Sequence, residues 1–279
     1  MLFGCFYFLL FIGGGLKFLF YFMTNLFFYS PLEQFEILPL FSLYFGGLDF
    51  SITNETVILA VIFFLISTFL YGCFKQSDST LFIVPHRWQI IIEIIYKMVL
   101  SMIIDNIDAK RGQLFFPLVF SIFFFIVNVN LIGLIPYSFT LTSHLIVTFA
   151  LSLALFLGIN IICVRLHGLE FFSLFFPSGT SVILALLLVP IELISYIFKP
   201  ISLSIRLFAN MMAGHTLLKV IAGFAWSLMG CTGILFLVHY VPLLILIPLF
   251  GLELGVGLIQ AFVFSVLTCI YLNDAVNLH

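Results

Sequence analysis

Long runs of apolar residues, separated by short polar segments, make up most of this chain. A helix needs about 20 such residues to cross the hydrocarbon core of a bilayer. Runs near this length or longer occur at 2–28, 57–74, 114–135, 141–164, 182–224 and 234–272. The last two are too long for single straight spans, so each predicts a broken helix or a strongly tilted one. Positions for a bend or a break are offered by four prolines: Pro190, Pro200, Pro242 and Pro248.

Segment 88–105 has a different pattern. Glu93, Lys97 and Asp105 lie among isoleucines that recur at near-helical spacing. This pattern predicts an amphipathic helix lying along the membrane interface. An ordinary span with a few polar positions is the alternative. The segment before it, 72–85, combines glycine, proline and polar residues and predicts a loop.

The amino-acid composition excludes a soluble domain. Hydrophobic residues make up 63% of the 279 residues and charged residues 8%, and the mean hydropathy is +1.31. The alternation typical of a transmembrane barrel is absent, and a helix satisfies its own backbone groups in lipid. We therefore predict an all-α polytopic membrane protein. It has five to six membrane helices, one interfacial amphipathic helix and two long, tilted or kinked C-terminal helices.

Charge and cysteine usage narrow the function classes. The net charge of −2 and the lack of a Lys/Arg run argue against nucleic acid as a partner. The five cysteines lie far apart without a C-x-x-C pair, so they indicate apolar filling rather than a zinc site or a disulfide framework. No Walker-type glycine-rich loop occurs, so the sequence offers no phosphate-binding motif of this kind. We expect no metal and no cofactor.

The basic residues predict an orientation. Five of the ten lie between the run ending at residue 74 and the one starting at 114: Lys75, Arg87, Lys97, Lys110 and Arg111. The positive-inside tendency places this side of the membrane inside. On this scheme, segment 182–224 runs from inside to outside and segment 234–272 returns.

Arg206 is the most informative residue of the chain, because it is surrounded by apolar sequence. Its guanidinium stays protonated at physiological pH. Its placement at bilayer depth costs about 3 kcal/mol on insertion scales and more than about 10 kcal/mol in simulations. Such a charge predicts a function, here an electrostatic gate. An internal ion pair that fixes helix packing is the alternative.

Titratable and amide side chains flank this charge along the two long helices. At 1.5 Å per residue, Glu192 lies about 21 Å to the inside of Arg206 on a continuous helix, and His215 about 13 Å to the outside. Glu253 and Gln260 are seven residues apart and share one helix face. If Gln260 is level with Arg206, Glu253 falls near His215. Because histidine and glutamate can exchange protons, this pattern predicts a relay toward a fixed cation.

Structural alternatives stay open for most of these residues. Glu192 and Lys199 share a face and can form an ion pair. Asn210, four residues after Arg206, can hold the backbone or that guanidinium. His215 can be a satisfied core residue, and Gln260 a bridge between helices. Gly251 and Gly255 predict close helix packing, and His239, His144 and Asn130 have no assigned role.

These residues also carry a resemblance to a known family. Four segments closely resemble subunit a of the F-type ATP synthases: Ser204-Ile-Arg206-Leu-Phe-Ala-Asn210-Met-Met-Ala-Gly214-His215, Gly251-Leu-Glu253-Leu-Gly-Val-Gly-Leu-Ile-Gln260-Ala, Tyr271-Leu-Asn-Asp-Ala275 and Asn130-Leu-Ile-Gly-Leu-Ile-Pro136. The resemblance extends from about Ser30 to the C-terminus. It identifies 30–279 as the membrane domain and leaves 1–29 as an apolar extension, expected to form an additional helix.

The resemblance implies a stator channel beside a rotating ring of c subunits, with a peripheral stalk, other Fo membrane subunits and lipid as further partners. Protons are taken up from the intermembrane space past four residues: His215, Asn210, Glu253 and Gln260. They leave past Glu192 into the matrix, and Arg206 prevents a direct passage. The order of histidine and glutamate at positions 215 and 253 resembles the mitochondrial forms, which implies the mitochondrial inner membrane.

Two other function classes fit parts of the pattern. A stand-alone proton or cation transporter predicts an internal repeat with interrupted helices, which the sequence does not show. A membrane subunit of an electron-transfer complex predicts pairs of haem-ligating histidines, but the six histidines are scattered.

Overall fold

The computed structural model describes residues 32–45, 48–75, 87–107, 109–135, 138–168, 182–229 and 238–276. The apolar run 2–28, and with it the expected additional helix, lies outside the described residues. Residues 76–85 of the expected loop lie outside them as well.

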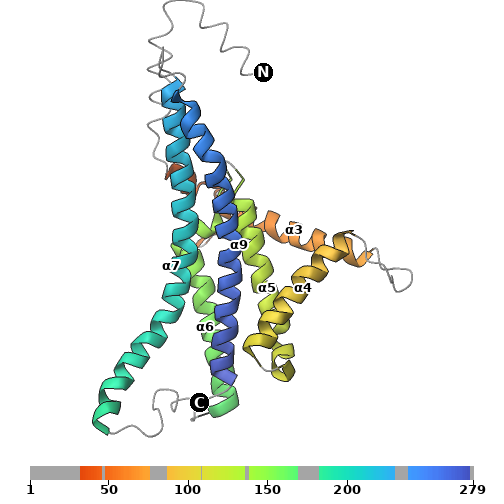
Figure 1. The fold of residues 1–279 in the computed structure, drawn as a ribbon, viewed down its shortest axis with the longest axis vertical. Helices are drawn as coiled ribbons and strands as arrows, with labels where there is room; N and C mark the ends of the chain where they lie inside the picture. The colour runs from red at the N-terminus through yellow and green to blue at the C-terminus, as the bar shows by residue number, and fades with distance from the viewer. Residues whose placement is uncertain are drawn as a thin grey trace, which may run out of the picture. The chain divides into compact units, whose positions relative to one another are not determined.

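The described chain is mostly helical (Figure 1). Its α-helices are α3 (Asn54–Lys75), α4 (Arg87–Asn106), α5 (Ala109–Gly133), α6 (Leu145–His167), α7 (Val182–Met229) and α9 (Tyr240–Val276). All of these except α4 are long and apolar enough to cross a membrane. The prediction of an all-α polytopic membrane protein is confirmed for the described residues.

The two long helices are not broken at their prolines. α7 runs through Pro190 and Pro200, and α9 runs through Pro248. Pro242 is the third residue of α9, in the first turn, where the missing N–H needs no partner. The structure therefore excludes the broken form, and the strong tilt stays a prediction. Neighbouring groups can satisfy the carbonyls that an internal proline leaves free in a membrane helix.

Two predicted boundaries were wrong. Residues 72–75 belong to α3 rather than to a loop. The run that begins at residue 141 starts with a short 3-10 helix, η2 (Leu141–Ser143), and α6 begins only at Leu145, after His144 at its N-cap. At the other end of α6, Gly168 has a φ of 58°, which favours glycine at this C-cap.

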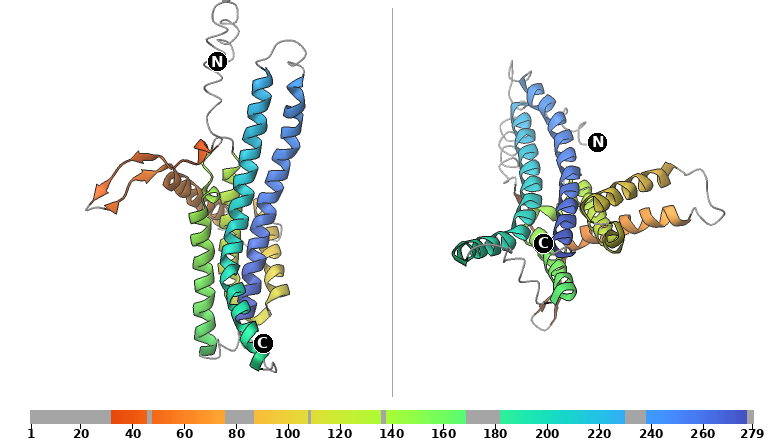
Figure 2. Two further views of the ribbon diagram at one scale, coloured as in Figure 1. Left: turned by 90° about the vertical axis from the view of Figure 1, so that its left-hand side faces the viewer. Right: turned by 60° about the horizontal axis from the view of Figure 1, so that its bottom comes forward.

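A short 3-10 helix, η1 (Glu33–Phe35), precedes a nested hairpin that the sequence interpretation missed. Strand β1 (Pro39–Phe41) pairs with β4 (Ile52–Thr53), and β2 (Tyr44–Phe45) pairs with β3 (Leu48–Asp49), both antiparallel (Figure 2). Pro39 lies opposite Thr53 and Phe41 opposite Ile52, with an irregularity between them. The Gly46-Gly47 dipeptide between β2 and β3 is the sequence signal that predicts such a hairpin.

The chain forms two compact units. The smaller unit contains Ala213–Glu253 and the described residues up to Glu36. The larger unit contains Ile37–Met212 and Leu254–His279. Its apolar core is contributed by α4, α5, α6, α7 and α9, with fully buried side chains such as Val99, Val119, Leu207 and Phe264.

Helix α4 is amphipathic, as predicted. Val99 and Ile103 are buried against α5, where Tyr96 packs on Phe116 with ring centroids 4.7 Å apart. On its outer side, Lys97 and Glu93 form an exposed ion pair at 2.9 Å. Its placement along the membrane interface stays a prediction.

Candidate functional site

Arg206 lies on the exposed surface of α7. The neighbouring positions Leu203 and Leu207 are buried in the core of the larger unit. Ser204 is fully buried and shares a 3.2 Å hydrogen bond between its Oγ and Thr148 Oγ1 on α6. These contacts fix the rotation of α7 about its axis, so that the guanidinium points outward. No described carboxylate lies within ion-pair distance of it, which argues against the internal ion pair.

Four polar residues of α7 form a stripe along its length: Glu192, Lys199, Arg206 and Asn210. On an ideal helix they lie within about 40° of one another. The buried positions, centred on Leu203 and Leu207, occupy the adjoining face. This arrangement follows from spacings of seven, seven and four residues, each close to a whole number of turns.

Asn210 and Gln260 connect α7 with α9. The Asn210 Nδ2 donates a 3.0 Å hydrogen bond to Gln260 Oε1. Gln260 is 4% exposed, and its Nε2 has no hydrogen-bond partner among the described residues. The predicted level of Gln260 near Arg206 is therefore supported within one helical turn, since Asn210 follows Arg206 by four residues. The alternative in which Asn210 holds the guanidinium is not what the structure has.

Asn130, to which the sequence assigns no role, connects two helices in the structure. Its Nδ2 donates a 2.9 Å hydrogen bond to the carbonyl oxygen of Gly257, which joins α5 to α9. A Cβ added at Gly257 would lie 3.3 Å from Met211 Cε and 3.6 Å from Asn130 Cβ. Gly257 thus lets α9 approach both α5 and α7 closely, three residues before Gln260. Because the bonded residues are 127 positions apart, sequence spacing could not reveal this contact.

His215 and Glu253 form the polar centre of the smaller unit. The distance between His215 Nε2 and Glu253 Oε1 is 3.6 Å. Glu253 is 5% exposed, and neither of its carboxyl oxygens has a hydrogen-bond partner among the described residues. The ring of Phe35 packs edge-on against His215, with centroids 6.3 Å apart. The predicted proximity of these two residues is confirmed, although their roles stay a prediction.

Gly214 makes room for this carboxyl group. A Cβ at this position would lie 2.7 Å from Glu253 Oε1 and 2.9 Å from Glu253 Cδ, closer than real Cβ contacts. By contrast, a Cβ at Gly251 or Gly255 would meet no described atom within 4 Å. The predicted close packing at Gly251 and Gly255 was therefore wrong for the described residues. On α7 and α9, the glycines that approach a neighbouring helix closely are Gly214 and Gly257 instead.

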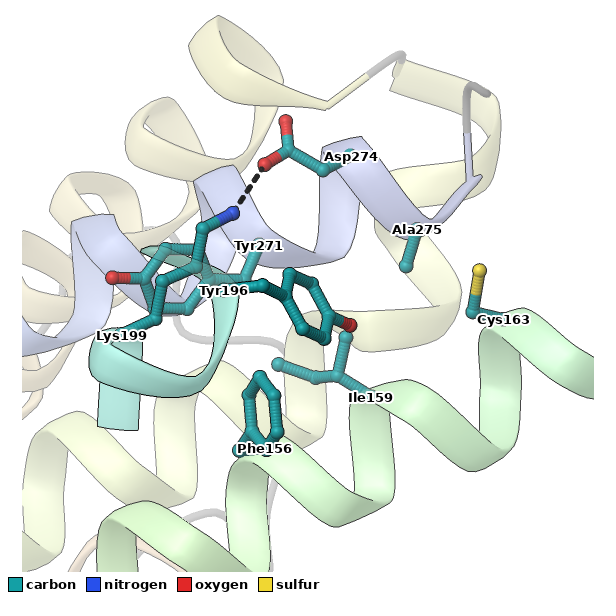
Figure 3. A pocket seen from close by; sticks show the side chains of 8 residues that line it. All are labelled: Phe156, Ile159, Cys163, Tyr196, Lys199, Tyr271, Asp274 and Ala275. Carbon is teal, nitrogen blue, oxygen red and sulfur yellow. Dashed lines mark hydrogen bonds and ion pairs between the residues drawn. The ribbon is translucent and has the colours of Figure 1, made fainter. Parts of the chain in front are cut away.

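Lys199 pairs with the far end of α9 and not with Glu192. Its Nζ is 3.3 Å from Asp274 Oδ2, and it lies over the rings of Tyr196 and Tyr271 (Figure 3). The alternative in which Lys199 pairs with Glu192 is not what the structure has, because Asp274 offers the ammonium a carboxylate across the helix interface. Glu192 itself is half-buried, and no hydrogen bond or ion pair to another described residue holds it.

The remaining polar side chains of the described residues are packed against aromatic rings or stand apart from one another. Among the described residues, no group of three or more His, Cys, Asp or Glu side chains comes together in a way that could hold a metal ion. His239 is buried beside Tyr240, with ring centroids 4.1 Å apart, and His144 stacks on Phe139 at 4.9 Å.

Comparison with known proteins decides the family. A sequence profile described as "ATP synthase A chain" matches residues 55–273, a range that includes each of the six candidate residues. The chain belongs to the ATP synthase A chain family. A protein named ATP synthase subunit a from Pylaiella littoralis is 54% identical over 254 residues, which cover 90% of this chain and 100% of that protein.

Other members of the family are nearly as similar. Proteins named ATP synthase subunit a from Chondrus crispus and Marchantia polymorpha are both 47% identical over 90% of this chain, covering 97% and 99% of their own lengths. These names support the ATP synthase interpretation and not the transporter or electron-transfer alternatives. As a subunit a family member with five apolar helices among its described residues, the chain is a multi-pass membrane protein.

Proposed function

We propose that six residues of this chain carry protons to and from the rotor of the ATP synthase: Arg206, Glu253, His215, Gln260, Asn210 and Glu192. As a member of the subunit a family, the chain is the proton-translocating subunit of the Fo sector. Its substrate is the proton, and its reaction partner on the rotor is a membrane-embedded carboxylate of the c-ring. ATP chemistry takes place on other subunits.

Uptake uses the His215–Glu253 pair and the Asn210–Gln260 bridge. Imidazole and carboxyl groups both gain and lose protons readily, and a separation of 3.6 Å needs only a small movement to become a direct hydrogen bond between them. The carboxamide groups of Asn210 and Gln260 do not titrate, but they offer donors and acceptors along the route. The buried Gln260 Nε2, which lacks a described partner, supports a hydrated cleft, because a buried donor needs a hydrogen-bond acceptor.

Arg206 separates uptake from release. The observation that carries this proposal is an outward-facing guanidinium in a membrane helix that has no described ion-pair partner. Such a cation attracts a rotor carboxylate in its ionised form and repels a proton that would cross directly between the two half-channels. A c-ring carboxylate can then pass Arg206 only after it has released its proton.

Release uses Glu192, two heptads toward the inside of Arg206 on the same stripe of α7. Its half-buried carboxylate can accept the proton that the rotor carboxylate gives up and pass it to water. Each proton that moves down the potential delivers about 2.3 kcal/mol per 100 mV. Rotation captures this energy only if protons cannot bypass the ring.

The proposed location is the mitochondrial inner membrane. The relatives from algae and a liverwort are named as ATP synthase subunits, and the order of His215 and Glu253 is the mitochondrial one by resemblance. Uptake then faces the intermembrane space and release faces the matrix. The c-ring, the peripheral stalk, the other Fo subunits and the surrounding lipid are the expected partners.

The test compares Glu253→Gln with Glu192→Gln in the intact complex, in sealed inner-membrane vesicles. The pH is varied on one side while the pH on the other side and the membrane potential are held constant. Glu253→Gln slows ATP synthesis by about 100-fold. This value is the lower end of the range expected when a positioned proton-transfer group is removed. This loss deepens as the pH on the uptake side rises. Glu192→Gln changes the dependence on release-side pH instead.

Glu93→Gln is the matched control, because Glu93 is an exposed carboxylate on α4 outside the proposed route. It leaves both pH dependences unchanged. If Glu253→Gln and Glu192→Gln respond identically to pH on both sides, the division into an uptake and a release half-channel is refuted.

A further inference from the structure

Lys199 is held in a cluster at the C-terminal end of α9. Its ammonium contacts Asp274 Oδ2 at 3.3 Å, and it lies 5.2 Å from the ring centre of Tyr196 and 4.9 Å from that of Tyr271 (Figure 3). The Tyr196 hydroxyl donates a hydrogen bond to Asn160 on α6, which fixes that ring. The lining residues leave a cavity of only about 10 Å³ between them. The ammonium is thus committed to one carboxylate and two aromatic faces.

Lys199 lies on α7 between two residues of the proposed proton route. Lys199 follows Glu192 by seven residues and precedes Arg206 by seven, on the same stripe. The three residues are therefore spaced about 10 Å apart along the helix axis. Lys199 lies midway between the proposed release carboxylate and the proposed barrier.

If Lys199 had no partner, its ammonium would attract the carboxylate of Glu192, a residue of the proposed proton route. Its long flexible stem carries a compact charge that can reach toward neighbouring groups. In a membrane interior, the low dielectric strengthens the attraction between such an ammonium and a nearby carboxylate. Glu192 would then be held in its ionised form by a fixed cation, and it would pass protons less readily.

We propose that Asp274 is a positioning residue for proton release, because it engages Lys199 and so leaves Glu192 available to the proton that leaves the rotor. The inference rests on the release role proposed above for Glu192. It assigns a role to a charged group on α9 whose partner is 75 residues away in the sequence. Asp274 acts through Lys199 and does not itself carry the proton.

The experiment is a mutant cycle in the intact ATP synthase, in sealed inner-membrane vesicles. Asp274→Asn slows ATP synthesis several-fold and alters its dependence on release-side pH. Lys199→Gln alone retains most of the rate, since no competing ammonium remains. The double variant Asp274→Asn/Lys199→Gln recovers most of the rate that Asp274→Asn loses. The conservative Asp274→Glu keeps the charge and retains activity.

A merely structural ion pair gives a different pattern. In that case Lys199→Gln is as harmful as Asp274→Asn, and the double variant shows no recovery, which overturns the proposal. Loss of assembled complex in Asp274→Asn, measured by native gel electrophoresis, also overturns it. Glu93→Gln, which removes the partner of Lys97 in the exposed pair on α4, is the matched control and leaves the rate unchanged.

Glu192→Gln, measured in the same vesicles, distinguishes a failure of the release role of Glu192 from a failure of the positioning role of Asp274. If it leaves proton release unaffected, the release role of Glu192 fails and the role of Asp274 fails with it. If Glu192→Gln impairs release while the double variant shows no recovery, only the role of Asp274 is overturned.

Discussion

Gly214 shows how much depends on a single hydrogen atom in place of a methyl group. The space that a Cβ would occupy at this position is taken by the carboxyl group of Glu253. A glycine in the middle of a helix is normally unfavourable by about 1 kcal/mol relative to alanine. Its presence in α7 is explained by the close approach of Glu253 and His215.

Gly214→Ala is expected to lower the rate of ATP synthesis by at least about tenfold. The new Cβ displaces the Glu253 carboxyl group from His215, and a misplacement of about 1 Å can cost about 100-fold in a proton-transfer step. Synthesis by the intact complex is the measurement, with the amount of assembled subunit as reference. Gly158→Ala on α6, where a Cβ meets no described atom within 4 Å, is the matched control. Equal rates in the two variants would contradict the role of Gly214.

The sequence was sufficient to find the candidate residues but not all of their partners. Charged and amide residues in apolar runs stand out, and heptad spacing correctly predicted that Glu253 comes near His215. The partner of Lys199 was not predicted, because helical spacing indicates only the alternative of Glu192, while the folded chain brings Asp274 from another helix. Contacts of this kind depend on how α7 and α9 pack, which periodicity alone does not determine.

At the scale of the elements, one buried side chain hydrogen-bonds α5 to α9. Asn130 donates to the carbonyl oxygen of Gly257, and the absence of a side chain at Gly257 allows the two helices to approach. Two residues earlier on the same helix, Asn128 donates instead to its own helix, at Phe124. The chain therefore contains a matched pair of asparagines, of which only one connects two helices.

Asn130→Leu is expected to destabilise the packing of α9 by about 1 kcal/mol, the typical net value of a buried hydrogen bond. The cause is the loss of the donor to Gly257 together with the larger side chain. The midpoint temperature at which subunit a dissociates from the detergent-solubilised complex is the measurement. Asn128→Leu, which removes only a bond within α5, shifts this midpoint less. A larger shift for Asn128→Leu would contradict the role of Asn130.

Elements were predictable where hydrophobic length alone decides them. The five membrane helices in the described residues follow from apolar runs, because lipid leaves a helix as the simplest way to satisfy the backbone. The hairpin of β1 to β4 was missed because its strands have only two or three residues, and the described strand β1 is exposed throughout. The start of α6 at Leu145 was also missed, since hydropathy does not distinguish a 3-10 turn from an α-helix.

At the scale of the whole molecule, the solvent is lipid and not water. Large apolar side chains are exposed along every membrane helix, for example Phe64 on α3, Ile146 on α6 and Leu244 on α9. In a soluble protein such surfaces would cause aggregation, but here they suit acyl chains and neighbouring subunits. Against this background Arg206 is the exception, because it is an exposed cation that has no ion-pair partner among the described carboxylates.

The most direct test of the account replaces this charge. In sealed inner-membrane vesicles that contain the intact complex, ATP synthesis and passive proton flux are measured for Arg206→Ala beside the unchanged protein. The account predicts that Arg206→Ala abolishes coupled synthesis and lets protons cross without it, because the barrier between the two half-channels is gone. Normal synthesis with no additional proton flux in Arg206→Ala would contradict it.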